Sequence, residues 1–215
     1  MSKLRITVLI SGNGSNLQAL IDDVDQKLAD TVIVRVISNR KGAYGLVRAE
    51  KAGIPTAYHN LLSYKRKYQD QEQKAREEYD ADLAELILKD EPNLVVCAGF
   101  MHVLSPKFLE PLEKNNVSII NLHPALRGQY NGANAIERAH KDFMEGKITQ
   151  TGVMIHYVIS EVDMGEPILQ QPVQLSHPED DNIEDLEARI HEIEHKAIVE
   201  GTRIAAERIR NARKA

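Results

Sequence analysis

The sequence predicts an α/β fold: a three-layer, doubly wound, mostly parallel sheet with an antiparallel edge. Short apolar runs rich in β-branched residues alternate with amphipathic segments from the start of the chain, which is the pattern of a parallel sheet covered by helices. Toward the C-terminus, two apolar runs follow each other with little helix between them, so we expect a hairpin at that edge.

The predicted strands are short apolar runs. They are Arg5–Ile10, Val32–Ile37, Thr56–His59, Leu94–Ala98, Val117–Leu122, Gly152–Ile159 and Ile168–Pro172. The predicted helices lie between and after them. They are Ser15–Leu28, Ala43–Ala52, Tyr64–Lys89, Pro106–Lys114, Ala133–Glu145 and Ile183–Arg210.

The highly charged segment Tyr64–Lys89 is predicted as a helix because Ala75, Tyr79 and Leu83 form one apolar stripe at helical spacing. The charged run Gln69–Asp82 within it is expected to be a solvated helix face. The segment Ile183–Arg210 carries a similar apolar stripe and is predicted as the last helix.

The composition is that of an ordinary globular protein. The 215 residues suit a single domain, 1–215, and 42% are hydrophobic. The net charge of −5 argues against a dedicated nucleic-acid binder. A single cysteine, Cys97, allows neither an internal disulfide nor a thiolate metal cluster. We see no secretory signal and no apolar run near ~20 residues, so we expect a cytoplasmic protein without membrane contact.

A glycine loop, Gly12–Asn16, follows the first predicted strand and precedes a helix. Backbone N–H groups at such a helix N-terminus can hold an anion. Leu17 stands where the dinucleotide fingerprint has its third glycine, and no Gly-Lys-Ser/Thr follows, so both nucleotide signatures fail. The loop favours a monophosphate over a dinucleotide; the alternative is a tight turn capped by Ser15.

The predicted fifth strand ends in Asn121 and His123, and Pro124 stops it directly after them. With a period of two, the amide and the imidazole lie on the same side of the strand. Together they could hold a developing oxyanion, and the imidazole could move a proton. The alternative is a histidine whose hydrogen bonds are satisfied at a strand end. Asp163, in a turn between two later strands, is weak evidence by itself.

Four stretches together carry a resemblance: SGNGSNLQAL at 11–20, CAGFM at 97–101, NLHPAL at 121–126, and HYV with EVDMGEPI between 156 and 168. From about Ile6 to Gly201 the chain resembles the phosphoribosylglycinamide formyltransferases of the folate-dependent formyltransferase family. The resemblance implies a Rossmann-like formyltransferase fold. It also implies transfer of the formyl group of 10-formyltetrahydrofolate to the amine of glycinamide ribonucleotide in purine biosynthesis.

The resemblance assigns expected roles to individual residues. The catalytic trio would be Asn121, His123 and Asp163. The folate co-substrate would contact Arg76, Met101, His102, Val103, Leu104, Val158, Ile159, Ser160 and Glu161. The ribonucleotide would contact Gly12, Asn13, Gly14, Ser15, Asn16 and Glu194. The phosphate would thus lie in the N-terminal half, about 1–100, and folate binding and catalysis in the half from about 100 to 215.

The resemblance also implies a protein that needs no metal, acts on small molecules and is a monomer or homodimer. Some positions depart from the family pattern. Prolines are common where this chain has Arg127 and Asn131, a histidine is frequent at Ile136, and an arginine is familiar at His102.

The sequence is also compatible with other functions. A formyltetrahydrofolate hydrolase shares the trio, as does a methionyl-tRNA formyltransferase, but both normally carry a further domain. A binding module with a decayed site is disfavoured because all three catalytic positions are filled. The motif His191-Glu192-Ile193-Glu194-His195 has the spacing of a zinc metallohydrolase, a more remote alternative that lacks a third ligand downstream.

Overall fold

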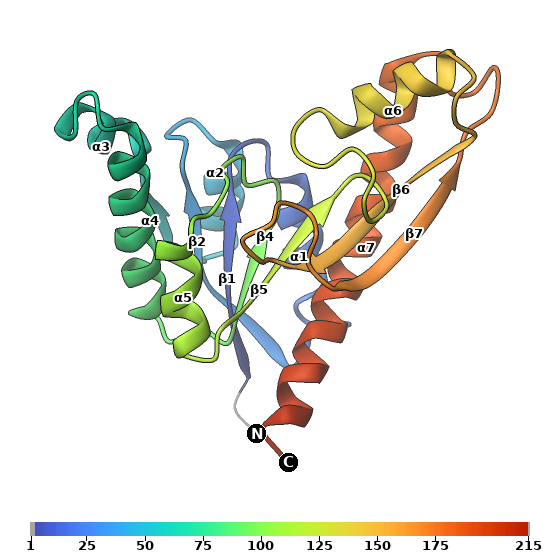
Figure 1. Cartoon of the computed structure of the whole chain (residues 1–215). Coiled ribbons are helices and arrows are strands. Elements are labelled where there is room, and N and C mark those ends of the chain that lie inside the picture. Colours follow the sequence, from blue (N-terminus) through green and yellow to red (C-terminus); the bar gives the residue numbers. More distant parts are fainter. Residues whose placement is uncertain (1–2, 215) are drawn as a thin grey trace.

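The computed structural model describes residues 3–214. These residues form one seven-stranded sheet between two layers of helices (Figure 1). The strands are β1 (Leu4–Ile10), β2 (Thr31–Ser38), β3 (Thr56–Tyr58), β4 (Leu94–Cys97), β5 (Ser118–His123), β6 (Gln150–Tyr157) and β7 (Pro167–Gln174). The helices are α1 (Ser15–Asp23), α2 (Tyr44–Lys51), α3 (Leu61–Lys67), α4 (Glu72–Leu88), α5 (Pro106–Lys114), α6 (Ala135–Met144) and α7 (Ile183–Ala212).

The strand order is β3-β2-β1-β4-β5-β6-β7. Strands β1 to β5 pair in parallel, whereas β6 runs antiparallel to β5, and β7 runs antiparallel to β6. The predicted α/β fold with an antiparallel edge is therefore confirmed. Because the chain reverses its direction of winding between β1 and β4, the crevice favoured for ligands lies at the carboxyl ends of these strands.

Two apolar cores hold the layers together. One core lies between the sheet and α1, α2, α6 and α7, and includes Val8, Leu17 and Ile190. The other lies between the sheet and α4 and α5, and includes Leu83 and Phe108. Strands buried on both faces explain the continuous apolar runs in the sequence, and Figure 1 shows α4 and α7 on opposite sides of the sheet.

The single helix predicted over Tyr64–Lys89 is wrong, because the segment contains two helices, α3 and α4. A turn separates them, with Asp70 in the left-handed region at φ 58°. Aspartate tolerates this conformation because its short polar side chain can bond locally, and it interrupts the helix there. The apolar stripe is confirmed, since Ala75, Tyr79 and Leu83 are buried in α4.

Two other helices are shorter than predicted. The first was expected to reach Leu28 but α1 ends at Asp23, and turns carry the chain to β2. The helix predicted over Ala133–Glu145 begins at Ala135, because Asn134 adopts the left-handed conformation at φ 56°. Neither change alters the topology.

The long helix α7 spans 30 residues and packs on β6 and β7. Gly201 lies where it meets β6. A Cβ atom added there would lie 2.7 Å from the side chain of Ile155. Glycine therefore lets the helix axis approach the sheet more closely than any other residue would.

No helix within residues 3–214 is both long enough and apolar enough to cross a membrane.

We expect Gly201→Ala to lower the free energy of unfolding by about 1–3 kcal/mol, because the added methyl group overpacks the contact with Ile155. Helix propensity alone would have the opposite effect, a gain of about 1 kcal/mol. Urea denaturation followed by circular dichroism measures the difference. Gly42→Ala is the control, because its Cβ would meet nothing within 4 Å. An alanine variant at 201 more stable than the parent protein would contradict the close approach.

Candidate active site

Three loops meet at the carboxyl edge of the sheet. They follow β1, β4 and β5, and the long β6–β7 connection joins them. A cleft of about 580 Å³ opens between the last three of these segments. Its lining includes 99–104, 121–124, 132–135 and 158–163. The cleft thus lies where the topology places ligands in open α/β sheets.

Asn121, His123 and Asp163 come together in this cleft. The Asn121 amide nitrogen donates to Asp163 Oδ1 at 3.4 Å. His123 Nδ1 lies 3.5 Å from Asp163 Oδ2, and His123 Nε2 donates to the Gln129 carbonyl at 3.3 Å. The carboxylate therefore contacts both strand residues, which share one side of β5 as the period of two predicts.

Asp163 sits in a strained turn that neighbouring residues hold in place. Its φ is 57°, in the left-handed region, and its side chain is buried. The Gly132 N–H donates to Asp163 Oδ2 at 2.8 Å. On either side of Asp163, the Arg127 guanidinium donates to the Met164 carbonyl and the Asn131 amide donates to the Val162 carbonyl. Both positions that depart from the family's prolines therefore clamp this turn.

His156 is a fourth polar group in the same cluster. The β5–β6 register places it opposite Asn121. Its Nδ1–H donates to the Tyr157 carbonyl at 2.9 Å, so Nε2 faces the Asn121 amide at 3.3 Å and Asp163 Oδ1 at 3.4 Å. His156 thereby fixes the orientation of both groups.

The environment of the cluster shifts two pKa values. Burial lowers the pKa of His123, and the Asp163 charge and the Gln129 carbonyl only partly oppose this. Burial alone would raise the pKa of Asp163, but hydrogen bonds from His156 and the Gly132 N–H, with the charge of His123, outweigh it and lower that pKa. Near neutral pH the pair is therefore a neutral imidazole beside an ionised carboxylate.

The glycine loop is packed tightly against α2. Gly14 has φ 76°, and a Cβ there would lie 2.6 Å from Gly45 Cα, so only glycine fits. The Arg48 guanidinium donates to the backbone carbonyl and the side-chain oxygen of Asn13. The N-terminus of α1 follows this loop directly, and backbone N–H groups at a helix N-terminus can hold an anion.

Glu194 comes from α7 to the same loop. The Asn16 amide donates to Glu194 Oε2 at 3.3 Å, although the two residues are 178 positions apart. Burial raises the pKa of Glu194, partly offset by the charge of His191 and the Asn16 bond. Within residues 3–214, Asn16 Oδ1 is buried without a hydrogen-bond partner. A polar atom in this state is suited to a ligand donor.

The residues expected to contact folate line the cleft as a group. Arg76, the segment Met101–Leu104 and the segment Val158–Glu161 all belong to its lining. Met101 and Val103 expose 70% and 51% of their surface, so apolar side chains form its rim. The His102 side chain, in contrast, turns away to bond Asp80.

The glycine loop and Glu194 lie outside the lining of this cleft, but Ser11 joins the two regions. The Ser11 N–H donates to the Gly99 carbonyl at 3.0 Å, and the Met101 N–H donates to Ser11 Oγ at 2.7 Å. The expected phosphate loop and the expected folate loop are therefore bonded neighbours.

The sequence did not reveal several of these contacts. Gly132, Gln129 and Ser11 act through backbone groups or a small hydroxyl, for which no motif exists. Asp80 belongs to the charged run expected to be solvated, yet it is fully buried. Only its spacing from the buried Leu83 and Ala84, three and four residues later on the helix, could have hinted at this.

Two remaining sequence features are resolved by the packing. Ile136 of α6 is buried in the apolar core, so its side chain contributes to packing. In the HEIEH segment, Glu194 is buried against Asn16 and His191 is exposed. Among residues 3–214, no group of three or more His, Cys, Asp and Glu side chains is placed to share a metal ion.

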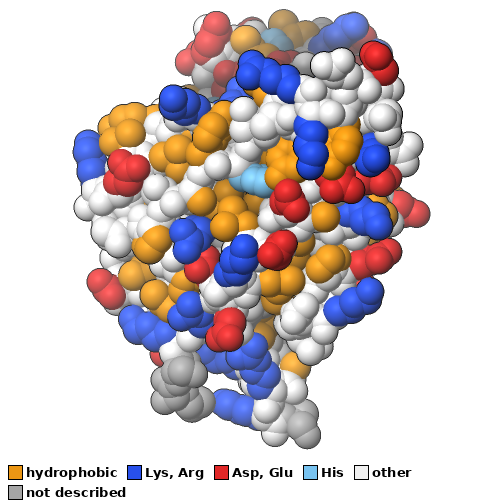
Figure 2. Space-filling view, turned by 90° about the vertical axis from the view of Figure 1, so that its left-hand side faces the viewer, with side chains coloured by type: hydrophobic (Ala, Val, Ile, Leu, Met, Phe, Trp, Pro, Cys, Tyr) orange, Lys and Arg blue, Asp and Glu red, His pale blue; other side chains and the backbone are white. Residues whose placement is uncertain are grey.

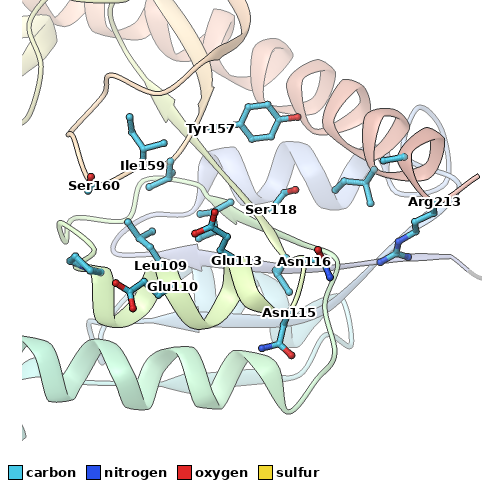
Figure 3. Close-up of a pocket in the computed structure, with 16 residues that line it drawn as sticks. Leu109, Glu110, Glu113, Asn115, Asn116, Ser118, Tyr157, Ile159, Ser160 and Arg213 are labelled. Atoms are coloured by element: carbon cyan, nitrogen blue, oxygen red, sulfur yellow. The ribbon is translucent and has the colours of Figure 1, made fainter. Parts of the chain in front are cut away.

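A second hollow of about 1020 Å³ lies between α5, the end of β6 and the last turn of α7 (Figure 3). Glu110, Glu113, Tyr157 and Arg213 are among its lining. The segment Val158–Ser160 lines both hollows and separates them. On the side of α4 and α5, acidic and basic side chains are interspersed around apolar patches (Figure 2).

Comparison with known proteins identifies relatives along nearly the whole chain. The formyl transferase family profile matches residues 4–202. A phosphoribosylglycinamide formyltransferase of Schizosaccharomyces pombe is 53% identical over 197 residues, covering 91% of this chain and 93% of the relative. Its counterpart in Dictyostelium discoideum is 47% identical, covering 93% and 96%.

A solved structure shares the fold. The glycinamide ribonucleotide transformylase 1 of Symbiobacterium toebii superposes with a TM-score of 0.80 at 33% identity, covering 95% of this chain and 88% of that one. The resemblance drawn from the sequence motifs is confirmed, and the chain belongs to the formyl transferase family.

Proposed function

We propose that this protein transfers the formyl group of 10-formyltetrahydrofolate to the amine of glycinamide ribonucleotide. The products are formylglycinamide ribonucleotide and tetrahydrofolate, in purine biosynthesis. The observation that carries the proposal is the cluster of Asn121, His123 and Asp163, which faces a cleft next to the glycine loop Gly12–Asn16. The family and the relatives named above support the same reaction.

The chemistry follows from the three side chains. The substrate amine attacks the formyl carbon, and the carbonyl electrons move onto oxygen. The amide of Asn121 and the imidazole of His123 hold that oxyanion by hydrogen bonds. The bond from the formyl carbon to folate N10 then breaks, and the amine proton passes to N10 through water that Asp163 orients.

The lowered pKa values suit these roles. The lowered pKa favours a neutral His123, which keeps one N–H that can donate a hydrogen bond to the oxyanion. The ionised Asp163 remains a proton acceptor and stabilises positive charge that develops on the imidazole. No metal ion is needed for these steps.

The two ligand regions would supply the positioning. The N–H groups of Gly12–Asn16 would hold the 5′-phosphate, and Glu194 would contact the rest of the ribonucleotide. Arg76, Met101–Leu104 and Val158–Glu161 would hold the folate, its pterin ring against the apolar rim. Such alignment of amine and formyl carbon supplies much of the rate in a two-substrate reaction.

We expect release of tetrahydrofolate from 10-formyltetrahydrofolate to depend on glycinamide ribonucleotide. A spectrophotometric assay of the purified protein, with and without the ribonucleotide, measures this. Equal rates under both conditions would instead identify a formyltetrahydrofolate hydrolase, which uses water as the acceptor. Activity that chelators abolish and zinc restores would favour the remote metallohydrolase alternative.

We expect His123→Ala and Asp163→Asn each to lower kcat by about 100- to 10,000-fold, because each removes a group that acts in the transition state. Steady-state kinetics measures the loss, and circular dichroism checks that the fold is intact. Asp185→Asn, an exposed change on α7, is the matched control. Near-parental turnover in either site variant would overturn the mechanism.

We expect the His123 ring to titrate below its ordinary pKa of about 6.5. Asp163→Asn should move the midpoint lower still, because the carboxylate charge favours the protonated ring. Since the unfolded state binds more protons in this window, stability should fall as the pH falls through about 6.5. NMR titration of the histidine rings measures both midpoints. A midpoint above 6.5, or one that rises in the asparagine variant, would contradict the assignment.

A further inference from the structure

The loop after β4 contributes six consecutive residues to the cleft, as many as the segment 158–163, yet it has no regular secondary structure. Residues Gly99–Leu104 all line the cleft, and no helix or strand forms before α5 begins at Pro106. A loop without a ladder of backbone hydrogen bonds keeps a defined shape only if side chains anchor it. Its anchors therefore bear on how well the cleft is formed before a ligand arrives.

Asp80 of α4 provides two anchors from one buried carboxylate. His102 Nε2 donates to Asp80 Oδ1 at 2.6 Å, and the Ser105 N–H donates to Asp80 Oδ2 at 2.8 Å. Asp80 is fully buried, and the His102 side chain is only 6% exposed. Buried bonds to a charged acceptor are among the stronger hydrogen bonds in proteins.

The surroundings reinforce this geometry. The His102 ring packs edge-on against Tyr79, with centroids 4.9 Å apart. One turn earlier on α4, the Arg76 guanidinium donates to the Val103 carbonyl at 3.2 Å. One face of α4 is thus hydrogen-bonded to the loop at three nearly consecutive residues, 102, 103 and 105.

Asp80 itself has no place in the reaction. It is absent from the lining of the cleft and is bonded to none of the three proposed catalytic residues. Burying a carboxylate costs free energy unless the group is paired. Both oxygens of Asp80 are bonded to the loop after β4, so we infer that Asp80 has a role in that loop.

We propose that Asp80 and His102 form a positioning pair that preshapes the folate side of the cleft. This inference rests on the proposed function, since it assumes that the cleft takes the folate co-substrate. By fixing both ends of 102–105, the pair presents the backbone of that segment and its apolar rim without an ordering cost on binding. The ribonucleotide loop lies across Ser11 and is not held by Asp80.

The test compares Asp80→Ala with Asp80→Asn. Alanine removes both acceptors, whereas asparagine can still accept from the Ser105 N–H and donate to a His102 tautomer with a free Nε2. We expect alanine to raise the KM for 10-formyltetrahydrofolate roughly ten- to hundred-fold. The KM for glycinamide ribonucleotide should stay within about two-fold, and asparagine should restore most of the loss.

His102→Ala and His102→Gln repeat the comparison should Asp80→Ala fail to fold. Glutamine keeps a donor toward Asp80, so it should be the milder change. Asp90→Asn is the matched control: Asp90 accepts from Arg35 at the opposite end of the sheet, so the change should lower stability without changing the folate KM.

Two results would overturn the positioning pair while the parental protein remains active. They are an unchanged folate KM in both alanine variants, and an equal rise in both KM values. A parental protein without ribonucleotide-dependent transfer would instead overturn the proposed function. Calorimetric titration with tetrahydrofolate then still tests the pair directly, because binding should weaken in Asp80→Ala and Asp90→Asn should leave it unchanged.

Discussion

The parallel pairing of β1, β4 and β5 is the constraint on which the site depends. It brings three strand ends to one edge, although they lie at residues 10, 97 and 123 of the chain. A loop begins at each strand end, and its backbone makes no ladder hydrogen bonds within the sheet. Polar groups can therefore gather there at little cost to the apolar cores on either side.

The antiparallel strands β6 and β7 add the third residue of the proposed catalytic cluster. Its connection to β7 returns across the end of β5 and carries Asp163 into contact with two residues about 40 positions earlier. The left-handed backbone at Asp163 costs of order 1 kcal/mol or more. Contacts from Gly132, Arg127 and Asn131 offset this strain, and they fix the position of the Asp163 carboxylate.

Local periodicity was enough to predict the strands, the sheet class and the shared side of Asn121 and His123. The glycine loop was also predictable, because its residues follow one strand consecutively in the sequence. Contacts made across the fold were not readable from pattern alone. The Asn16–Glu194 bond joins residues 178 positions apart, and the resemblance implied only that each contacts the ribonucleotide. The burial of Asp80 and the break at Asp70 depend on how α3 and α4 pack. That packing cannot be predicted from the sequence of a highly charged segment.

The hydroxyl of Ser11 has a consequence for the organisation of the chain. It accepts from the Met101 N–H and donates to Asn39, so the loops after β1, β2 and β4 share one buried atom. The expected boundary near residue 100 between two halves thus falls inside a hydrogen-bonded junction. A cut there would separate β4 from β5, which pair in parallel, and would expose the apolar flank of β4. We therefore expect the two ligand regions to unfold together.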